Sequence, residues 1–175
     1  MATRARIGIM QEDGNIVASY QHWDGYPGGL GYNLIDNWED PKKVTEAILL
    51  GDSSKWHYII GDKIDFDDRN NPMHDVQNVY YMRDRGEKDC NHKVYTSEEA
   101  YIKNGFNSGE EYIYLMKMDG KQDWSGNKIG TWYYVASRYT ETGKEAVGNV
   151  FKPLLPVAIK EHIEILQRYM EREVA

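Results

Sequence analysis

The sequence predicts an α+β fold: a mostly antiparallel sheet of about five strands, with an N-terminal β-hairpin, packed by short helices and a long C-terminal helix. Three observations predict it. Residues 5–22 read as two strands around an Asp13-Gly14 turn, which is typical of a hairpin. Residues 76–86, 111–118 and 130–138 alternate as strands do. Residues 153–173 repeat apolar side chains at helical spacing.

Length and composition favour one domain over residues 1–175, large enough to bury a core. The net charge is −7 with acids and bases interspersed, which argues against binding long nucleic acid, because such proteins need a basic face. Cys90 is the only cysteine, so no intrachain disulfide forms and a reducing cytoplasm is expected. No signal peptide or membrane-spanning run is recognisable, so we expect a cytoplasmic protein that does not contact membranes.

The first hairpin fixes which side chains share a face. A two-residue type I′ turn at Asp13-Gly14 predicts that Ile9 faces Ala18. That register sets Arg6 on the same face as Trp23, where a guanidinium could stack on the indole or bind an anion. A solvated strand end is the alternative interpretation. The arginines so placed are Arg4 and Arg6.

Helices are expected between and after the strands. Residues 29–38 carry apolar residues four apart, and Asp40-Pro41 provides an N-cap followed by proline for a second helix ending near Gly51. Ser97 caps a short helix. Residues 52–75 are predicted to be an irregular polar connection, whose aspartates lack the spacing of a calcium loop. The last helix carries an apolar stripe of Leu155, Ile159, Ile163, Leu166 and Met170.

The stretch from His22 to Gly29 reads His-Trp-Asp-Gly-Tyr-Pro-Gly-Gly. No other stretch of this length combines so many reactive, aromatic and turn-forming residues. Gly25 can supply a positive φ and Pro27 fixes its own φ, so a sharp ordered turn leaving a strand is expected. Rigid loops of this kind concentrate binding residues. A purely structural corner is the alternative. The candidate ligand-binding side chains here are His22, Trp23, Asp24 and Tyr26.

A second cluster reads Arg-Asp-Arg-Gly-Glu over residues 83–87. On a strand, Arg83 and Arg85 would share a face and form a fork for phosphate or carboxylate. The alternative is an ion-pair network in which Asp84 and Glu87 neutralise both arginines. All four are candidate ligand-binding residues.

Several well-known reaction centres are absent from the sequence. There is no phosphate-binding G-x-x-x-x-G-K-S/T run, no G-x-S-x-G, no H-E-x-x-H and no C-x-x-C. The five histidines have no metal-ligand spacing, so we predict neither a metal nor a cofactor. No catalytic residue can be assigned, although His22 and Asp24 could serve as a base and its orienting acid.

The chain resembles a family of small tailed-bacteriophage proteins of unassigned function. The resemblance rests on His22-Trp23-Asp24-Gly25-Tyr26-Pro27 and on Tyr80-Tyr81-x-Arg83-Asp84-Arg85-Gly86-Glu87, and it extends over nearly the whole chain. It implies an accessory protein that works in the cytoplasm of the host bacterium, and it implies no particular activity.

Three functions follow as hypotheses. The first is a phage accessory protein, for host takeover or anti-defence, that binds a small anionic ligand such as a cyclic or signalling nucleotide, with arginines on phosphates and Trp23 and Tyr26 stacked on a base. The second is a hydrolase or nucleotide-modifying enzyme using His22 and Asp24 with Arg83, Asp84 and Glu87. The third is an inhibitor that covers a host protein with its tyrosine-rich surface. A homo-oligomer is compatible with each.

Overall fold

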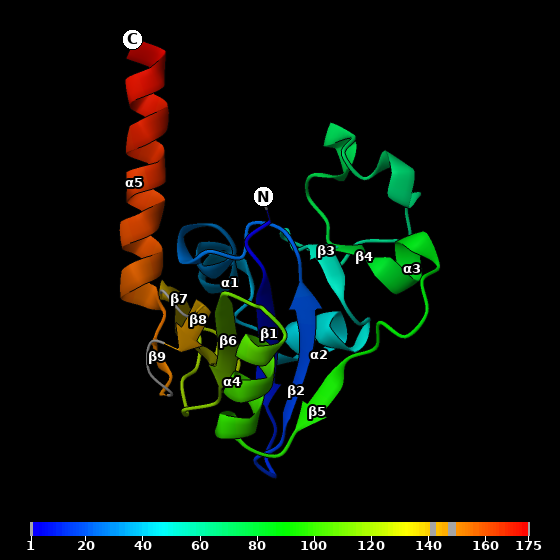
Figure 1. Cartoon of the computed structure of the whole chain (residues 1–175), viewed down its shortest axis with the longest axis vertical. Helices are drawn as coiled ribbons and strands as arrows, with labels where there is room; N and C mark the ends of the chain where they lie inside the picture. The colour runs from blue at the N-terminus through cyan, green and yellow to red at the C-terminus, as the bar shows by residue number, and fades with distance from the viewer. Residues whose placement is uncertain (1, 141–142, 147–149, 175) are drawn as a thin grey trace.

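The computed structural model describes residues 2–140, 143–146 and 150–174. It confirms an α+β fold with an N-terminal hairpin and a long C-terminal helix (Figure 1). The helices are α1 (Tyr32–Asn37), α2 (Pro41–Leu49), α3 (Tyr81–Arg85), α4 (Glu98–Asn107) and α5 (Leu155–Val174), with single turns η1 (Pro27–Gly31), η2 (Phe66–Asp68) and η3 (Pro72–His74). The strands are β1 (Ala5–Met10), β2 (Ile16–Gln21), β3 (Ser53–Lys55), β4 (Val79–Tyr80), β5 (Lys93–Tyr95), β6 (Tyr112–Lys117), β7 (Thr131–Thr140), β8 (Gly143–Ala146) and β9 (Lys152–Pro153).

The sheet is mixed and larger than predicted. Its order is β4-β3-β2-β1-β6-β7-β8, with β5 paired to β2 and β9 paired to β7. The pairs β1–β6 and β2–β3 are parallel. The prediction of a mostly antiparallel sheet of about five strands is therefore wrong. Local alternation identifies a strand, but parallel pairing is set by the long crossovers that join distant segments.

The first hairpin forms where predicted, but its register differs by one residue. Ile9 pairs with Val17 and not with Ala18. A type I′ turn needs positive φ at both central residues. Among the described loop residues only Gly14 has it, at 87°, and Asp13 does not. The loop is one residue longer as a result, and a shift of one residue changes every cross-strand neighbour.

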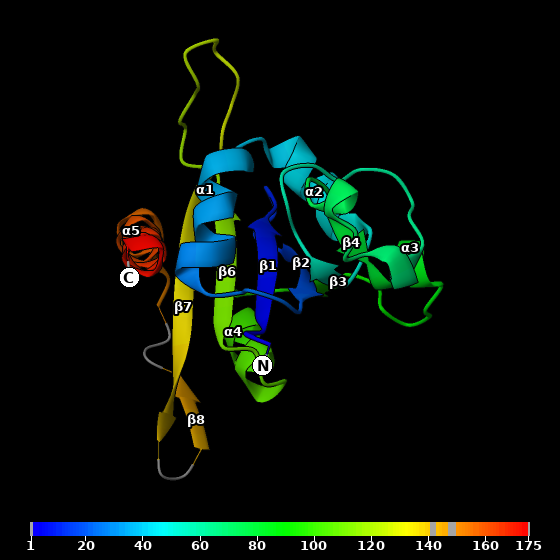
Figure 2. The ribbon, with the colours of Figure 1, turned by 90° about the horizontal axis from the view of Figure 1, so that it is seen from above.

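Helices cover both faces of the sheet. On one face, β1 packs with α1, α2 and the start of α5 around Trp38, which is completely buried. On the other face, Tyr101 of α4 packs on Ile16 and Ala18 of β2 and is also completely buried. In Figure 2, β1, β6 and β7 lie side by side, and the loop between β6 and β7 extends past the sheet. Both turn residues predicted to start α2 and α4 act as caps: Asp40 accepts from Lys42 N–H and Ser97 from Ala100 N–H.

The C-terminal helix α5 rises away from the rest of the chain (Figure 1). Its predicted apolar stripe, which a pattern of this kind normally turns to a core, is 41–67% exposed at all five residues. The side that contacts the body instead presents Ala158, Glu161, His162 and Ile165. Within the part of the chain that the structure describes, no helix has the length and apolar character needed to cross a membrane.

Candidate ligand-binding pocket

The turn after β2 is held by backbone hydrogen bonds on both sides. Trp23 N–H donates to Ser54 O at 3.0 Å, and Gly25 N–H donates to Thr3 O at 2.9 Å. The ordered turn at a strand end is therefore present. Its positive φ, 58°, belongs to Asp24 and not to Gly25, contrary to prediction. Gly25 is required for a different reason: a Cβ there would lie 2.5 Å from Thr3 O.

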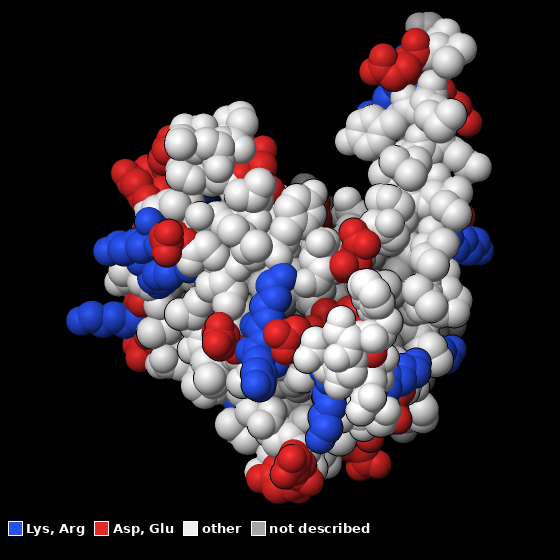
Figure 3. All heavy atoms as spheres, turned by 180° about the vertical axis from the view of Figure 1, so that it is seen from behind, with Lys and Arg blue, Asp and Glu red and all other residues white. Residues whose placement is uncertain are grey.

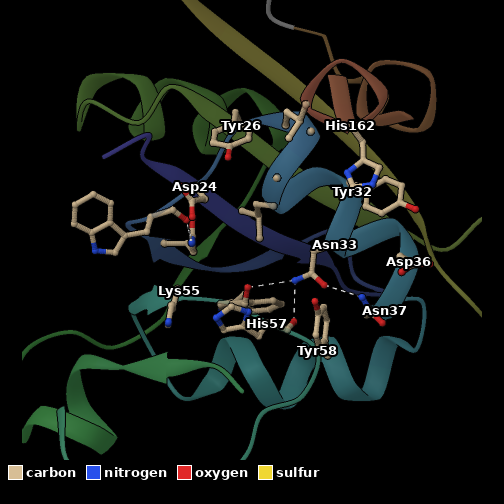
Figure 4. A pocket seen from close by; sticks show the side chains of 17 residues that line it. Asp24, Tyr26, Tyr32, Asn33, Asp36, Asn37, Lys55, His57, Tyr58 and His162 are labelled. Atoms are coloured by element: carbon tan, nitrogen blue, oxygen red, sulfur yellow. Dashed lines mark hydrogen bonds between the residues drawn. The ribbon is translucent and has the colours of Figure 1, made fainter. Parts of the chain in front are cut away.

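A cavity of about 350 Å³ opens beside this turn (Figure 4). That volume lies within the range of small-molecule sites. Its walls come from the turn, from η1 and α1, from the segment that follows β3, and from the inner side of α5. We call it the motif pocket. Its polar and aromatic lining consists of Gln21, Trp23, Asp24, Tyr26, Tyr32, Asn33, Asp36, Asn37, Lys55, Trp56, His57, Tyr58 and His162.

Three buried polar atoms in this lining have no hydrogen-bond partner within the described protein: Gln21 Oε1, Trp56 Nε1 and His57 Nε2. Gln21 is 1% exposed and Trp56 is 5% exposed. Gln21 Nε2 donates to Trp23 O, which fixes the amide so that Oε1 is the free acceptor. Buried polar groups are normally satisfied, and leaving one unsatisfied costs about 1–3 kcal/mol. These three atoms, one acceptor, one donor and one imidazole nitrogen, are buried and belong to residues that line the motif pocket.

The segment carrying Trp56 and His57 is fixed to α1 by side-chain amides. Asn33 Nδ2 donates to His57 O at 2.8 Å, and Asn37 Nδ2 donates to Asn33 Oδ1 at 2.8 Å (Figure 4). Trp38 Nε1 also donates to His57 O, at 2.7 Å. These bonds fix the segment that carries Trp56 and His57 against α1 and Trp38.

Aromatic rings supply flat faces in the same cavity. Tyr32 and His162 are stacked with ring centroids 3.7 Å apart and an interplanar angle of 3°. This stack joins α1 to α5, as Figure 4 shows. Tyr26 lies nearby, and burial followed by the charge of Asp24 raises the pKa of its hydroxyl, so it stays protonated as a donor at neutral pH.

Both signs of charge are present at the motif pocket. Lys55 lines it and makes only a long contact with Asp75, with 3.7 Å between Nζ and Oδ1. Asp24 and Asp36 are the carboxylates of the lining. Arg168 of α5 lies close enough to Tyr26 to oppose the rise in the pKa of that hydroxyl. The site can therefore pair an anionic group with Lys55 while its carboxylates accept from hydroxyl groups.

Acidification is expected to destabilise the protein through His57. Burial, and then the charge of Lys55, lowers the pKa of His57 below its usual 6.5, while Asp75 and Asp24 act in the opposite direction. Between the lowered folded pKa and 6.5, the unfolded chain binds more protons, so the free energy of unfolding falls as the pH falls through that window. Melting temperatures across roughly pH 5 to 8 test this. His57→Gln should make the profile shallower than that of the wild type, and equal profiles for the two proteins would contradict the assignment.

Arg6 lies outside the motif pocket. With the observed register it pairs with Tyr20 across β1 and β2 and is 6% exposed, so its predicted place beside Trp23 is wrong. Its guanidinium donates to Glu110 Oε1, to Asn104 Oδ1 at 2.6 Å and to the Tyr95 hydroxyl. All three nitrogens of the Arg6 guanidinium therefore donate hydrogen bonds within the fold.

The predicted strand over 76–86 is also wrong, and with it the fork of Arg83 and Arg85. Within this range the strand is β4 alone, and α3 follows over Tyr81–Arg85 with Gly86 as its C-cap at a φ of 73°. Positions two apart on a helix point in different directions. The carboxylate of Asp84, inside this helix, accepts from the N–H of the N-cap residue Tyr80 at 2.7 Å and from Ile64 N–H at 3.0 Å, which ties the helix to both segments.

The remaining side chains of this cluster have partners near by. Arg83 donates to the carbonyls of Ile60, Gly61 and Asn78 at 3.0–3.1 Å and to Asp84. Arg85 and Glu87 form an exposed ion pair. The alternative interpretation of this cluster, a structural ion-pair network, matches these contacts.

His22 and Arg4 lie together at the edge of the turn. His22 Nδ1 is 2.6 Å from the Tyr20 hydroxyl, and its ring meets the Trp23 ring edge-on. Burial, and then the charge of Arg4, lowers the pKa of His22.

Of the ten candidate ligand residues, the structure brings Trp23, Asp24 and Tyr26 into the motif pocket.

The other pocket residues were not singled out from the sequence. They come from segments as distant as β3 and α5, and each alone is an ordinary polar or aromatic residue. The signal that could have indicated some of them is the polar surplus of α1, whose Asn33, Asp36 and Asn37 share a helix with buried Leu34. Among the described residues, no group of three or more His, Cys, Asp or Glu side chains could hold a metal ion.

Two other hollows are larger, but their linings carry fewer features of a binding site. One, of about 470 Å³, lies between β1 and α2, and one of about 590 Å³ lies beside residues 118–129. Neither is lined by a buried polar atom that lacks a partner among the described residues. The motif pocket is therefore the better candidate site.

Comparison of the chain with known proteins found no matching family model, no matching curated protein and no matching solved structure.

Proposed function

We propose that this chain is a phage accessory protein that binds a small anionic, nucleotide-like ligand in the motif pocket. One observation carries the proposal: three residues that line a cavity with flat aromatic rings also carry buried hydrogen-bonding atoms without a partner within the described protein. A nucleobase offers both a π-face for stacking and donors and acceptors along its edge. The phage origin, the host cytoplasm and homo-oligomer formation stay predictions.

The base would lie against the inner wall. Gln21 Oε1 accepts and Trp56 Nε1 donates, so the wall complements a base edge that carries one donor and one acceptor. His57 Nε2 can take either role because its pKa is lowered and the ring is neutral at pH 7. A polar site built in this way rejects ligands that leave its groups unpaired.

The sugar and phosphate would lie toward the mouth. Lys55 is the lysine of the lining and provides the charge for a phosphate. Asp24 and Asp36 are acceptors for ribose hydroxyls. The proposed ligand contacts therefore use Trp23, Asp24 and Tyr26 of the motif, whereas Arg6 and Arg83 act within the fold.

The test is calorimetric titration of the purified protein with a panel of mononucleotides and cyclic nucleotides. Trp56→Phe removes the indole N–H and leaves a smaller aromatic ring, and we expect it to weaken binding about tenfold, the value of one hydrogen bond. Lys55→Met should weaken binding of phosphorylated members selectively. The matched controls are Trp124→Phe and Lys63→Met, which alter exposed residues outside the motif pocket.

Three outcomes decide the matter. Tight binding that both pocket variants weaken, with intact ligand released on heat denaturation, supports sequestration. Release of a chemically converted ligand would instead indicate that the function is catalysis. Absence of binding to every member, or equal affinities for Trp56→Phe and Trp124→Phe, would contradict the proposal.

A protein inhibitor is the second candidate, and one observation favours it. Trp124 is 100% exposed in the loop between β6 and β7, which extends past the sheet (Figure 2). Asp123 orders this loop by accepting from Ser125 N–H at 2.9 Å and from Asn127 N–H at 2.8 Å. Exposed tryptophans are enriched among residues that dominate protein interfaces. A host protein that co-purifies with the wild type and is lost with Trp124→Ala would favour this function.

A further inference from the structure

The exposed side of α5 carries six large apolar residues in one line. They are Leu155, Ile159, Ile163, Leu166, Met170 and Val174, and each is at least 41% exposed. We call this set the α5 stripe. Its residues follow one another at steps of four, four, three, four and four. Steps of three and four keep side chains on one side of a helix, which is how helices meet in pairs.

The order of these steps reads the same in both directions. A second copy of α5 laid antiparallel therefore sets every member of the α5 stripe opposite another member. The opposed pairs are Leu155 with Val174, Ile159 with Met170, and Ile163 with Leu166, each formed twice. A patch that matches itself under a two-fold rotation is what an isologous dimer needs.

The charges of α5 also permit self-pairing. Two chains of net charge −7 repel each other, so an interface between copies must keep carboxylates apart. Glu161 lies on the side that faces the body, against Gly28. By helical spacing Glu164 and Glu171 fall outside the α5 stripe, whereas Glu173 falls within it near the end of the helix, where the antiparallel arrangement sets it opposite Pro156 and not opposite another carboxylate. In the view of Figure 3 the middle of the projecting helix is mostly uncharged, with acidic and basic side chains toward its free end.

The outer half of α5 has little support within its own chain. Ala158, Glu161, His162 and Ile165 contact the body, and Arg168 and Tyr169 lie close enough to Tyr26 to affect its pKa, whereas the end of the helix projects beyond the body (Figure 1). An isolated helical segment this short is marginally stable in water, so a projecting helix gains from packing. In the antiparallel arrangement, each projecting half covers the anchored half of the partner.

We propose that two copies of this chain form a two-fold dimer by antiparallel packing of their α5 stripes. The pairing buries the six apolar residues of each copy and places the two bodies at opposite ends of the helix pair. It does not depend on the ligand of the motif pocket, because the α5 stripe and the pocket-lining residues of α5 lie on different sides of the helix.

Sedimentation equilibrium of the full chain tests the dimer. Leu166→Asp places two carboxylates at the centre of the interface, and we expect it to raise the dimer dissociation constant by more than about a hundredfold. Gln167→Asp is the comparison variant, because it adds the same charge at the edge of the α5 stripe and should therefore weaken the dimer less than Leu166→Asp does. Leu166 is 48% exposed in the single chain, so circular dichroism and the monomer fold should be unchanged.

Disulfide trapping tests the direction of packing. In a Cys90→Ser background, Ile159→Cys and Met170→Cys proteins should cross-link when mixed and oxidised, because these positions face each other. Neither should cross-link alone, since like positions lie about 16 Å apart along the helices, beyond disulfide reach. A monomer at the highest soluble concentration, a Leu166→Asp protein that still dimerises, or cross-linking of Met170→Cys with itself would each overturn the proposal.

Discussion

Replacing Gly25 with valine is expected to lower the free energy of unfolding by about 2–4 kcal/mol. A Cβ at this position would lie 2.5 Å from Thr3 O and 2.8 Å from Ala5 Cβ, and backbone cannot move aside as a flexible side chain can. The clash also breaks the bond from Gly25 N–H to Thr3 O, which fixes the turn against the start of β1. Chemical denaturation monitored by tryptophan fluorescence measures the loss.

Gly14→Ala is the matched control for this substitution. Gly14 has a positive φ of 87° but open space around it, so it reports conformational strain alone, about 1 kcal/mol. We also expect Gly25→Val to lose ligand binding, because Trp23, Asp24 and Tyr26 flank the displaced residue. A Gly25→Val protein as stable as the wild type would show that the turn does not need this close approach.

Arg6→Ala is expected to destabilise the fold by about 3–5 kcal/mol. Arg6 and Glu110 are nearly inaccessible, with side chains 7% and 2% exposed, and removing the cation leaves a buried carboxylate alone. Burial already raises the pKa of Glu110 against the opposing charge of Arg6. Without Arg6 the carboxylate would take up a proton more readily, so the loss should be smaller in acid than at neutral pH.

Two comparisons separate this structural role from anion binding. The double variant Arg6→Met with Glu110→Leu should recover part of the lost stability, because it removes both buried charges. Arg85→Ala, which breaks the exposed pair with Glu87, should change stability little. If Arg6→Ala left stability intact but abolished ligand binding, Arg6 would be a ligand residue after all.

Local sequence determined most of the secondary structure around the site. The hairpin, the caps at Asp40 and Ser97 and the amphipathic α5 follow from turn residues, capping residues and periodicity, which act within a few positions. Local sequence misled at residues 76–86, where the alternation favoured a strand. There the carboxylate of Asp84, inside helix α3, accepts from Tyr80 N–H and from Ile64 N–H, and Ile64 is twenty residues away.

The ordered turn at His22 to Pro27 was predictable from its glycines and proline, and three of its side chains do line the motif pocket. The wall opposite was not, because Lys55, Trp56 and His57 lie on a segment whose short strand β3 is too polar to recognise. The parallel pairing of β2 with β3, at Gln21 and Ser53, brings that segment to the turn. A register depends on packing across the whole sheet and leaves no local signal.

The sequence by itself determined the fold class, the amphipathic last helix and the turn that organises the site, because each depends on interactions between near neighbours. Only the tertiary structure decided what those parts do. It turned Arg6 and Arg83 inward to buried partners, brought distant polar atoms into the wall of one cavity, and left the stripe of α5 facing solvent. The physical reason is the same in each case: burial and exposure are set by what the rest of the chain packs against, and periodicity cannot encode that.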